Sequence, residues 1–355
     1  MPNTIIIGSG SYLPNRVIGR DFFMDSEFYS EDGAKIDKPT EETISKFVEI
    51  TEIENRRFID EDLSNSQIGF EAAKIAISDA NIDQEELDYI IYASNFGEVT
   101  VNGYVDFMPT MAARVKNKLG IKNRKCITYD MVFGCPGWVE AMILADNLIK
   151  AKVAKTILVV GGETLSRVTD PYDRNKMIFA DGAGAVVVKA TEQENVGIIA
   201  HNTICDNGIE LNYLANGPSI NKEADQTRLY VRMLGRKIYE YALKNVPTAI
   251  KDTIDDAGLS IEDIDKILIH QANAKMDYAM IDRLHKLYDV KNYDHAVSPM
   301  TVQDLGNTSV ATIPTMFDLI IKGKMQGHSF KDNGNIVMTS VGAGMNINAI
   351  VYRFP

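Results

Sequence analysis

The stretch DANIDQEELDYIIY, which occupies Asp79–Tyr92, returns in the second half of the chain as DAGLSIEDIDKILI at Asp256–Ile269. The two stretches align without a gap. Five of the fourteen pairs are identical, and four more exchange only Ile with Leu or Asp with Glu. Each copy reads as the end of a helix, a turn, a short acidic segment and then a continuous apolar strand. The sequence therefore predicts that the chain contains two related halves.

The similarity continues beyond the two apolar strands. In each half a helix pattern comes next, followed by a second apolar strand; the helices span Pro136 to about Lys150 and Thr308 to about Lys322, and the strands begin at Thr156 and Ile336. Apolar runs of this kind are typical of strands in a mostly parallel sheet with helices on both faces. We therefore expect an α/β fold in which two similar halves pack about a pseudo-twofold axis.

The two halves meet near the middle of the chain. We place the boundary so that the N-terminal half spans residues 1–195 and the C-terminal half spans residues 196–355. No linker rich in Pro, Gly or Ser separates them, so we expect one compact body rather than two flexible lobes.

The composition limits the partners and the location. With 49 acidic and 37 basic side chains among 355 residues, the formal net charge is −12, which argues against a nucleic acid partner. No apolar run approaches the roughly 18 residues of a membrane-spanning helix. The start MPNTIIIG lacks the features of a signal peptide, and three cysteines in such a chain indicate a reducing compartment. We expect a cytoplasmic protein with no membrane partner.

Cys135 is the candidate nucleophile. It lies in FGCPGW (Phe133–Trp138), directly before the first of the two matching helices, and Pro136 suits the first position of a helix. A helix N-terminus stabilises a thiolate, so we predict a lowered thiol pKa and a reactive sulfur. The alternative, a small buried apolar residue, suits Cys126 in its apolar run and also Cys205.

His270 and Asn307 occupy corresponding places in the second half. His270 ends the repeated apolar strand in IHQAN, and Asn307, in LGNTSV, begins the helix that matches the one after Cys135. Taken singly, His270 reads as a structural histidine and Asn307 as a helix N-cap. Because functional groups gather at the carboxyl ends of strands in such sheets, the pseudo-symmetry predicts that the three side chains meet in one cleft. The other four histidines lack metal-ligand spacing, so we assign no metal.

A cysteine faced by a histidine and an asparagine from the opposite half fits the carbon–carbon condensation of thioesters. The thiolate accepts the acyl group, and the two polar side chains donate hydrogen bonds to the oxygen of an enolate. A cysteine protease uses the same residue types, but its histidine must lie beside the sulfur as a base. The placement of His270 and Asn307 therefore favours condensation.

Three ordered motifs, GCPGW around Cys135, HQAN at His270–Asn273 and GNTS at Gly306–Ser309, resemble those of the β-ketoacyl-acyl carrier protein synthase III family of the thiolase superfamily. The resemblance spans nearly the whole chain, and includes IGSGSYLP near its start and DGAGA in its middle. It implies a thiolase-like, five-layered α-β-α-β-α fold, a homodimer, and no metal or redox cofactor. Asn307 is typical of the initiating, type III branch, since the chain-elongating relatives have a second histidine there.

The resemblance also implies a role for each residue of the site. Cys135 attacks an acyl thioester, and the oxygen of the acyl-enzyme is held by the backbone N–H groups of Cys135 and of the turn that contains Ala343 and Gly344. Malonyl-acyl carrier protein then enters, and His270 and Asn307 stabilise the enolate that forms as carbon dioxide leaves. The product is a 3-oxoacyl thioester.

The chain departs from the family pattern where relatives bind coenzyme A. The Trp and Arg that hold the adenine ring in well-known members fall at Lys46 and Ile50, and only Arg174 remains of that set. We therefore expect an acyl group that arrives on a carrier protein or another thioester rather than as acetyl-coenzyme A. The family's CAGF is CPGW here, so Trp138 is predicted to alter the wall beside the sulfur.

A basic surface is needed to dock an acidic carrier protein. Arg228, Arg232 and Arg236 recur every four residues and would form one stripe on a helix. Lys275 corresponds to a docking arginine of the family, so the resemblance assigns docking to Arg232, Arg236 and Lys275. A solvated helix face is the alternative.

The segment Asn95–Thr110 corresponds to the part of the family that reaches across the dimer and closes the partner's acyl pocket. Phe107 and Met108 are therefore predicted to contact the acyl chain. Ordinary packing in the core or in a subunit interface is the alternative.

Three other functions stay open at this point. A nicotinamide-dependent oxidoreductase would use Gly8-Ser9-Gly10 as a dinucleotide turn, but Leu13 stands where the third glycine belongs. A related enzyme of secondary metabolism would join two acyl or 3-oxoacyl thioesters. An inactive partner subunit is disfavoured because Cys135, His270 and Asn307 are all present.

Overall fold

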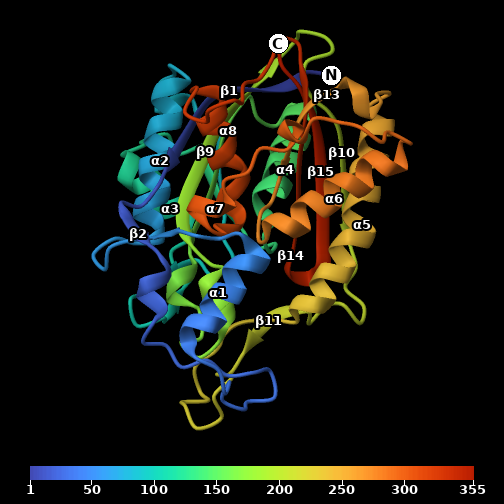
Figure 1. Cartoon of the computed structure of the whole chain (residues 1–355). Helices are drawn as coiled ribbons and strands as arrows, with labels where there is room; N and C mark the ends of the chain where they lie inside the picture. Colours follow the sequence, from blue (N-terminus) through green and yellow to red (C-terminus); the bar gives the residue numbers. More distant parts are fainter.

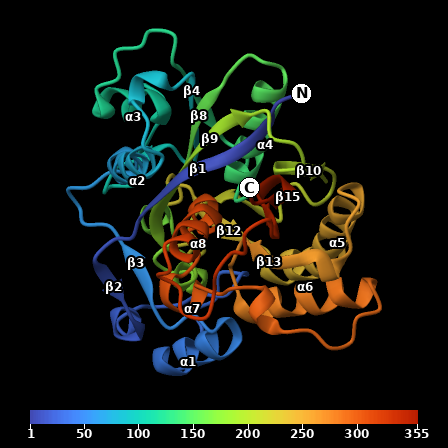
Figure 2. The same ribbon diagram turned by 90° about the horizontal axis from the view of Figure 1, so that it is seen from above.

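The computed structural model describes residues 1–355 and arranges them in five layers (Figures 1 and 2). Two β-sheets form the second and fourth layers, and helices lie between the sheets and on both outer faces. The first sheet has the strand order β1 (Asn3–Tyr12), β9 (Asp181–Thr191), β8 (Thr156–Thr164), β4 (Tyr89–Ala93), β7 (Ile127–Met131). The second has the order β10 (Gly197–Cys205), β15 (Asn346–Arg353), β14 (Asn335–Gly342), β13 (Ile264–Ile269).

The helices fill the other three layers. The middle layer is α4 (Gly137–Lys150) and α8 (Thr312–Ile321); the outer layers are α2 (Asn65–Asp79) with α3 (Met111–Leu119), and α5 (Gly235–Asp256) with α6 (Ala274–Leu287). In β8, Ile157 and Val159 join the apolar cluster around the middle layer, whereas Leu158 and Val160 join the cluster under α2 and α3. Side chains of a strand point alternately to opposite faces, so both faces of β8 are buried. The five-layered α/β fold is confirmed.

The sequence repeat is also a structural repeat. The end of α2 leads through a 3₁₀ turn (Gln84–Glu86) into β4, and the end of α5 leads through a 3₁₀ turn (Ile261–Asp263) into β13. Both short turns begin with a capping box. The side chain of the first residue accepts from the backbone N–H three residues later, and the side chain of that later residue accepts from the backbone N–H of the first. The order β1-β9-β8-β4 matches β10-β15-β14-β13, and only β7 has no counterpart.

The sheets are mixed, so the prediction of mostly parallel sheets is wrong. β4 pairs in parallel with β7 and β8, and β13 pairs in parallel with β14, but the remaining neighbours are antiparallel. The reason is visible at β15, which follows β14 after only three residues, Ala343–Met345. A parallel neighbour needs a crossover of a dozen or more residues, so this short turn returns the chain antiparallel.

The smaller elements cover the end of the sheets where β8 and β13 terminate. A fourth apolar cluster lies here and includes Leu165 just after β8 and Ala274 just after β13. The elements near this end and at the rim of the first sheet are α1 (Thr40–Thr51), α7 (Val302–Leu305), β2 (Arg16–Ile18), β3 (Arg56–Phe58), β5 (Glu98–Val99), β6 (Val105–Asp106), β11 (Leu214–Gly217) and β12 (Tyr230–Met233). None of the helices is both long and apolar enough to span a membrane.

Candidate active site

The turn that carries Cys135 packs directly against the turn that follows β14. A Cβ on Gly134, which has φ +76°, would lie 2.8 Å from the backbone N and O of Ala343. A Cβ on Gly342 would lie 2.6 Å from the backbone N of Cys135. Only glycine permits this approach from either side. The two halves therefore contribute neighbouring backbone segments, the turns that carry Cys135 and Ala343, to one site.

Ser309 connects the three predicted catalytic residues. It lines a cavity together with Cys135, and its side chain lowers the pKa of the Cys135 thiol. Its backbone N–H donates to Asn307 Oδ1 at 2.8 Å, and its backbone raises the pKa of the neighbouring His270 imidazole, whose Nδ1 is buried without a hydrogen-bond partner. The structure thus brings Cys135, His270 and Asn307 together around one residue, although Cys135 belongs to the first half and the others to the second.

The side chains of Asn307 and His270 are both set up as hydrogen-bond donors. Asn307 Oδ1 accepts from the backbone as a capping residue would, so the remaining group of that side chain is its NH₂. Its backbone is pinned by hydrogen bonds to Ile178 and Ala180. Burial lowers the pKa of His270 to about 4, which leaves a neutral imidazole with one N–H at neutral pH.

The Cys135 thiol differs from the prediction. Burial raises its pKa to about 11, and the nearby carboxyl of Glu163 adds to the rise, while the Ser309 side chain lowers it. Helix α4 begins at Gly137 with Pro136 as its N-cap, so Cys135 lies outside the first turn, where the helix dipole acts most strongly. Desolvation outweighs the dipole, and the predicted fall in pKa is wrong.

Glu163, Asn95 and Ser309 are parts of the site that sequence reasoning missed. Glu163 is the second-last residue of β8, is 1% exposed, and accepts a hydrogen bond from the Asn95 backbone at 2.7 Å. Burial raises its pKa to about 8. The signal was available, since Glu163 is the first charged residue after the apolar strand that begins at Thr156, and Ser309 belongs to the GNTS motif.

The cavity beside Cys135 has a volume of about 180 Å³ and a mostly apolar lining. Its walls include the side chains Phe96, Leu165, Phe179, Leu214 and Val231. An apolar cavity of about 150 Å³ holds a benzene molecule, so this one has room for an acyl chain of about six carbon atoms.

Trp138 does not belong to this cavity. It is 1% exposed and lies in the apolar cluster between the two sheets, with its ring against Gly161. The first turn of α4 directs it into the core instead of toward the acyl chain, so the predicted substrate contact is corrected to a packing role. Cys126 is buried as expected, whereas Cys205 is exposed at the end of β10 and that prediction is wrong.

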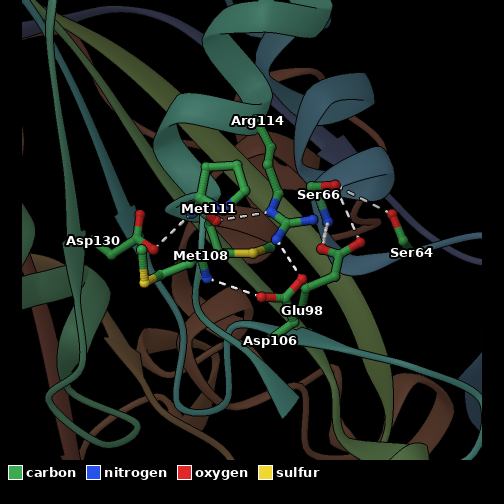
Figure 3. Close-up of polar contacts among 9 residues, drawn as sticks. Ser64, Ser66, Glu98, Asp106, Met108, Met111, Arg114 and Asp130 are labelled. Carbon is green, nitrogen blue, oxygen red and sulfur yellow. Dashed lines mark hydrogen bonds and ion pairs between the residues drawn. The ribbon is translucent and has the colours of Figure 1, made fainter. Parts of the chain in front are cut away.

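Phe107 and Met108 lie on the outer surface of this chain, 49% and 85% exposed, and do not line its cavity. Figure 3 shows how their loop is held at its base. Asp106 accepts from the Met108 backbone at 2.9 Å and from the Arg114 guanidinium at 2.7 Å, and Asp130 accepts from the first backbone N–H groups of α3. Glu98 accepts in the same way from the start of α2 at Ser66. The loop presents two apolar side chains outward from a fixed base.

A larger groove of about 590 Å³ lies between α1, the start of α5 and the start of α6. Lys46, Ile50 and Arg174 all line it, so the three positions that relatives would use for an adenine ring do share one groove. Lys38 and Arg236 also line it, and Glu42 is the acidic residue among its walls. The groove therefore carries a net positive charge on an acidic protein.

The basic residues predicted for docking do not form one helical stripe. Arg228 lies before β12 and donates to the backbone of Arg167, and Arg232 lies within β12 and donates to the backbone of Pro218. Only Arg236 is helical, at the start of α5, where it pairs with Glu240. The strand β12 breaks the spacing, so the stripe is wrong. Arg236 at the start of α5 lines the groove, whereas Lys275 near the start of α6 lines a separate hollow together with Glu49 and Glu52.

Comparisons with known proteins agree with this geometry. The family model for 3-oxoacyl-[acyl-carrier-protein] synthase III matches residues 129–207, and the model for its C-terminal part matches residues 254–354. The chain is 33% identical to the β-ketoacyl-[acyl-carrier-protein] synthase III of Erythrobacter litoralis, with 100% of both chains covered. That of Clostridium acetobutylicum is also 33% identical, over 100% of this chain and 99% of the relative.

The chain belongs to the β-ketoacyl-acyl carrier protein synthase III family. The crystal structure of the Aquifex aeolicus synthase III has a TM-score of 0.80 and 29% identity, covering 99% of this chain and 100% of that one. The Thermus thermophilus synthase III has a TM-score of 0.80 and 28% identity over 99% of both chains. The resemblance seen in the motifs is thereby confirmed, and the protein is an acyltransferase of the condensing type.

Family membership removes the nicotinamide-dependent alternative, and the fold explains the glycines that suggested it. Gly8 and Gly10 lie within β1 rather than in a turn. A Cβ on Gly8 would come within 2.4 Å of the Ala80 backbone, and one on Gly10 within 2.3 Å of the Ala72 backbone. These glycines allow α2 to pack closely on the first sheet.

Proposed function

We propose that the protein catalyses the decarboxylative condensation of an acyl thioester with malonyl-acyl carrier protein, which yields a 3-oxoacyl thioester. The observation that supports it most is the proximity of Cys135, His270 and Asn307 to Ser309, which brings a thiol and two hydrogen-bond donors near one residue. Membership of the family and the apolar cavity beside the sulfur support the same reaction.

The first half-reaction transfers the acyl group to Cys135. The sulfur forms a bond to the thioester carbon, and the carrier thiol leaves with a proton. The negative charge on the tetrahedral oxygen is held by the backbone N–H groups of Cys135 and of Ala343 or Gly344, which cost no reorganisation because the two turns are packed rigidly together. The acyl chain extends into the cavity of about 180 Å³.

The second half-reaction forms the carbon–carbon bond. As carbon dioxide leaves malonyl-acyl carrier protein, the electron pair of the broken bond becomes an enolate whose oxygen accepts hydrogen bonds from His270 and Asn307. The enolate carbon then attacks the acyl carbon, and the Cys135 sulfur leaves as a thiolate and recovers a proton. A neutral His270 can donate a hydrogen bond to the enolate oxygen, and it has no positive charge that would attract the malonyl carboxylate.

We also propose that the acyl group arrives on an acyl carrier protein. Lys46 and Ile50 offer no aromatic face for an adenine ring, while the cations around the groove suit a phosphate-bearing arm. Arg236 on the groove wall and Lys275 in the neighbouring hollow would then contact the acidic carrier protein, with Arg232 contributing less because its guanidinium is engaged by Pro218. Because Cys135 must act as a free thiol, a reducing cytoplasmic location suits this function.

A homodimer is part of the proposal. The edge strand β7 exposes Ile127 and Tyr129, and the neighbouring loop exposes Phe107 and Met108. An open edge with apolar side chains is a surface that a second copy would cover. Met108 would then approach the acyl cavity of the partner. If so, Met108→Trp shortens the longest acyl chain accepted and Met108→Ala lengthens it, and an unchanged chain-length profile would count against this arrangement.

The function is tested by two measurements on the same samples. Mass spectrometry of the intact protein follows acylation of Cys135 from a panel of acyl-coenzyme A and acyl-carrier protein donors, with Cys135→Ala as the control. Release of carbon dioxide from malonyl-acyl carrier protein follows the second step. His270→Ala and Asn307→Ala should still be acylated but lose about 10²–10³-fold in decarboxylation. Acylation without any use of malonyl-acyl carrier protein would instead favour an enzyme that joins two acyl thioesters.

A further inference from the structure

Ser309 is held in a backbone conformation that its side chain disfavours. Its φ is +52°, in the left-handed region where residues with a Cβ are rarely found, and it is 3% exposed. Two hydrogen bonds fix it there: its N–H donates to Asn307 Oδ1 at 2.8 Å, and its Oγ accepts from Asn95 Nδ2 at 2.9 Å. Backbone strain of this kind persists only where the surrounding structure holds the residue in place, and it is characteristic of functional sites.

The bond from Asn95 decides what the Ser309 hydroxyl does. The amide nitrogen of Asn95 can only donate, so it occupies a lone pair of Ser309 Oγ and leaves the hydroxyl proton for another acceptor. Cys135 lines the same cavity as Ser309, and the Ser309 side chain lowers the pKa of its thiol.

Asn95 is itself fixed in place by the first half of the fold. It lies just after β4, and its backbone N–H donates to Glu163 Oε1 at 2.7 Å. Glu163 lies near the end of the neighbouring strand β8. The amide that orients Ser309 is therefore supported by two adjacent strands, and the contact between Asn95 and Ser309 joins the two halves beside the sulfur.

We propose that Asn95 and Ser309 are positioning residues that direct a hydroxyl proton at the Cys135 sulfur and so stabilise its thiolate. This proposal rests on Cys135 being the nucleophile of the proposed function. A donor to the charged form favours that form. The thiolate is needed twice, as the group that attacks the acyl donor and as the group that leaves when the new carbon–carbon bond forms, so one hydrogen bond serves both half-reactions.

The pKa of Cys135 agrees with this arrangement. Burial and Glu163 raise it, and the Ser309 side chain is the neighbouring side chain that lowers it. Removing the hydroxyl, or reversing its direction, should therefore raise the thiol pKa further and reduce the thiolate fraction at any fixed pH below it.

The test measures thiolate directly, without any substrate. The rate of alkylation of Cys135 by iodoacetamide is followed from pH 6 to pH 10 by peptide mass spectrometry in the full-length protein. The exposed Cys205 in the same samples is the internal reference for pH and reagent. Ser309→Ala should slow alkylation of Cys135 about tenfold at pH 7.5 and shift its profile upward by about one pH unit, since one unit of pKa is a tenfold change in thiolate.

Two further variants separate the hydroxyl from the backbone strain. Ser309→Gly removes the hydroxyl but relieves the positive φ, so it should be at least as stable as the parent protein and yet show the same upward shift. Asn95→Asp replaces the donor by an acceptor that takes the Ser309 proton for itself, so it should shift the profile in the same direction. The double variant should add little, because both changes act through one hydroxyl.

The outcomes decide the proposal independently of the condensation. A profile for Cys135 that stays unchanged in folded Ser309→Gly and Asn95→Asp, with Cys205 also unchanged, overturns it. Shifted profiles support it even in a preparation that does not consume malonyl-acyl carrier protein. Thermal unfolding of each variant establishes that a shift does not come from loss of the fold.

Discussion

Gly342 lies so close to Cys135 that a Cβ at position 342 would come within 2.6 Å of the Cys135 backbone nitrogen. The same added atom would lie 2.7 Å from Pro136 Cδ, so there is no space for a Cβ between Gly342 and the Cys135 turn. This contact joins the end of β14 in one half to the start of α4 in the other, and it sets where the sulfur and the N–H groups proposed to hold the oxyanion lie relative to each other.

Gly342→Ala should therefore impair acyl transfer although it replaces no side chain of the site. Displacing the Cys135 turn by about an ångström is expected to reduce acylation of Cys135 by about 10²-fold. The measurement is the single-turnover rate of acyl-enzyme formation. Gly19→Ala is the matched control, since the nearest atom to its added Cβ is 3.6 Å away and its rate should stay normal. Equal acylation rates for both variants would contradict the argument.

Glu163 should make the stability of the protein depend on pH. Burial raises its pKa from 4.5 to about 8, so between these values the folded protein holds a proton that the unfolded chain has released. This contribution to stability is fully present below pH 4.5 and is lost as the pH rises through about 8.

Glu163→Gln carries no proton to lose and keeps an oxygen for the Asn95 N–H. The difference in free energy of unfolding between Glu163→Gln and the parent protein should shift in favour of the variant by about 2–4 kcal/mol between pH 5 and pH 8.5. Urea unfolding at several pH values measures it, with Glu192→Gln on the exposed connection between the halves as the control. A difference that stays constant over this range would show that Glu163 ionises at its ordinary pH.

Lys46→Trp should restore the use of coenzyme A thioesters. The position lines the groove beside Arg174, and a stacked ring contributes about 1–3 kcal/mol per base. The KM for an acyl-coenzyme A should fall about 5- to 100-fold, while the KM for the same acyl group on a carrier protein stays unchanged. Lys74→Trp on α2, where Lys74 pairs with Glu71 at the surface, is the control. If the two donors respond alike, the groove does not take an adenine ring.

Arg236→Glu and Lys275→Glu should weaken the binding of carrier-borne substrates only. Charges at the rim of an interface act mainly on association and its salt dependence, so the KM for malonyl-acyl carrier protein should rise about tenfold at low salt and less at high salt. Arg232→Glu should have a smaller effect because its guanidinium is held by Pro218. Kinetics that are unaffected in all three variants would exclude this face as the docking surface.

The fold and the three central residues could be predicted because their signals are local in sequence. The repeat survives as an ungapped alignment that includes Asp79 and Asp256, and Cys135, His270 and Asn307 each stand at a strand or helix boundary within a short motif. The sheet orders and the meeting of these residues follow from that repeat. The division at residues 195 and 196 stays a prediction, and the connection there runs from Thr191 to Gly197.

The failures concern properties that only the folded chain possesses. The thiol pKa depends on how deeply Cys135 is buried, and no sequence pattern encodes that depth. Arg228 and Arg236 have helical spacing, but β12 lies between them because its strand pairs with β11. Trp138 is adjacent to the nucleophile in sequence, yet the helical turn directs it into the core. Asn95 and Ser309 are 214 positions apart, so their contact has no local signature.

The exposed connection between β9 and β10 has a practical consequence for engineering. Cutting the chain there would separate the sulfur from its imidazole and carboxamide, and would also split the apolar cluster that α4 and α8 share. Each fragment alone would be inactive, and activity would return only when the two fragments reassociate. The molecule is therefore a natural starting point for a split reporter whose output records the proximity of two fused proteins.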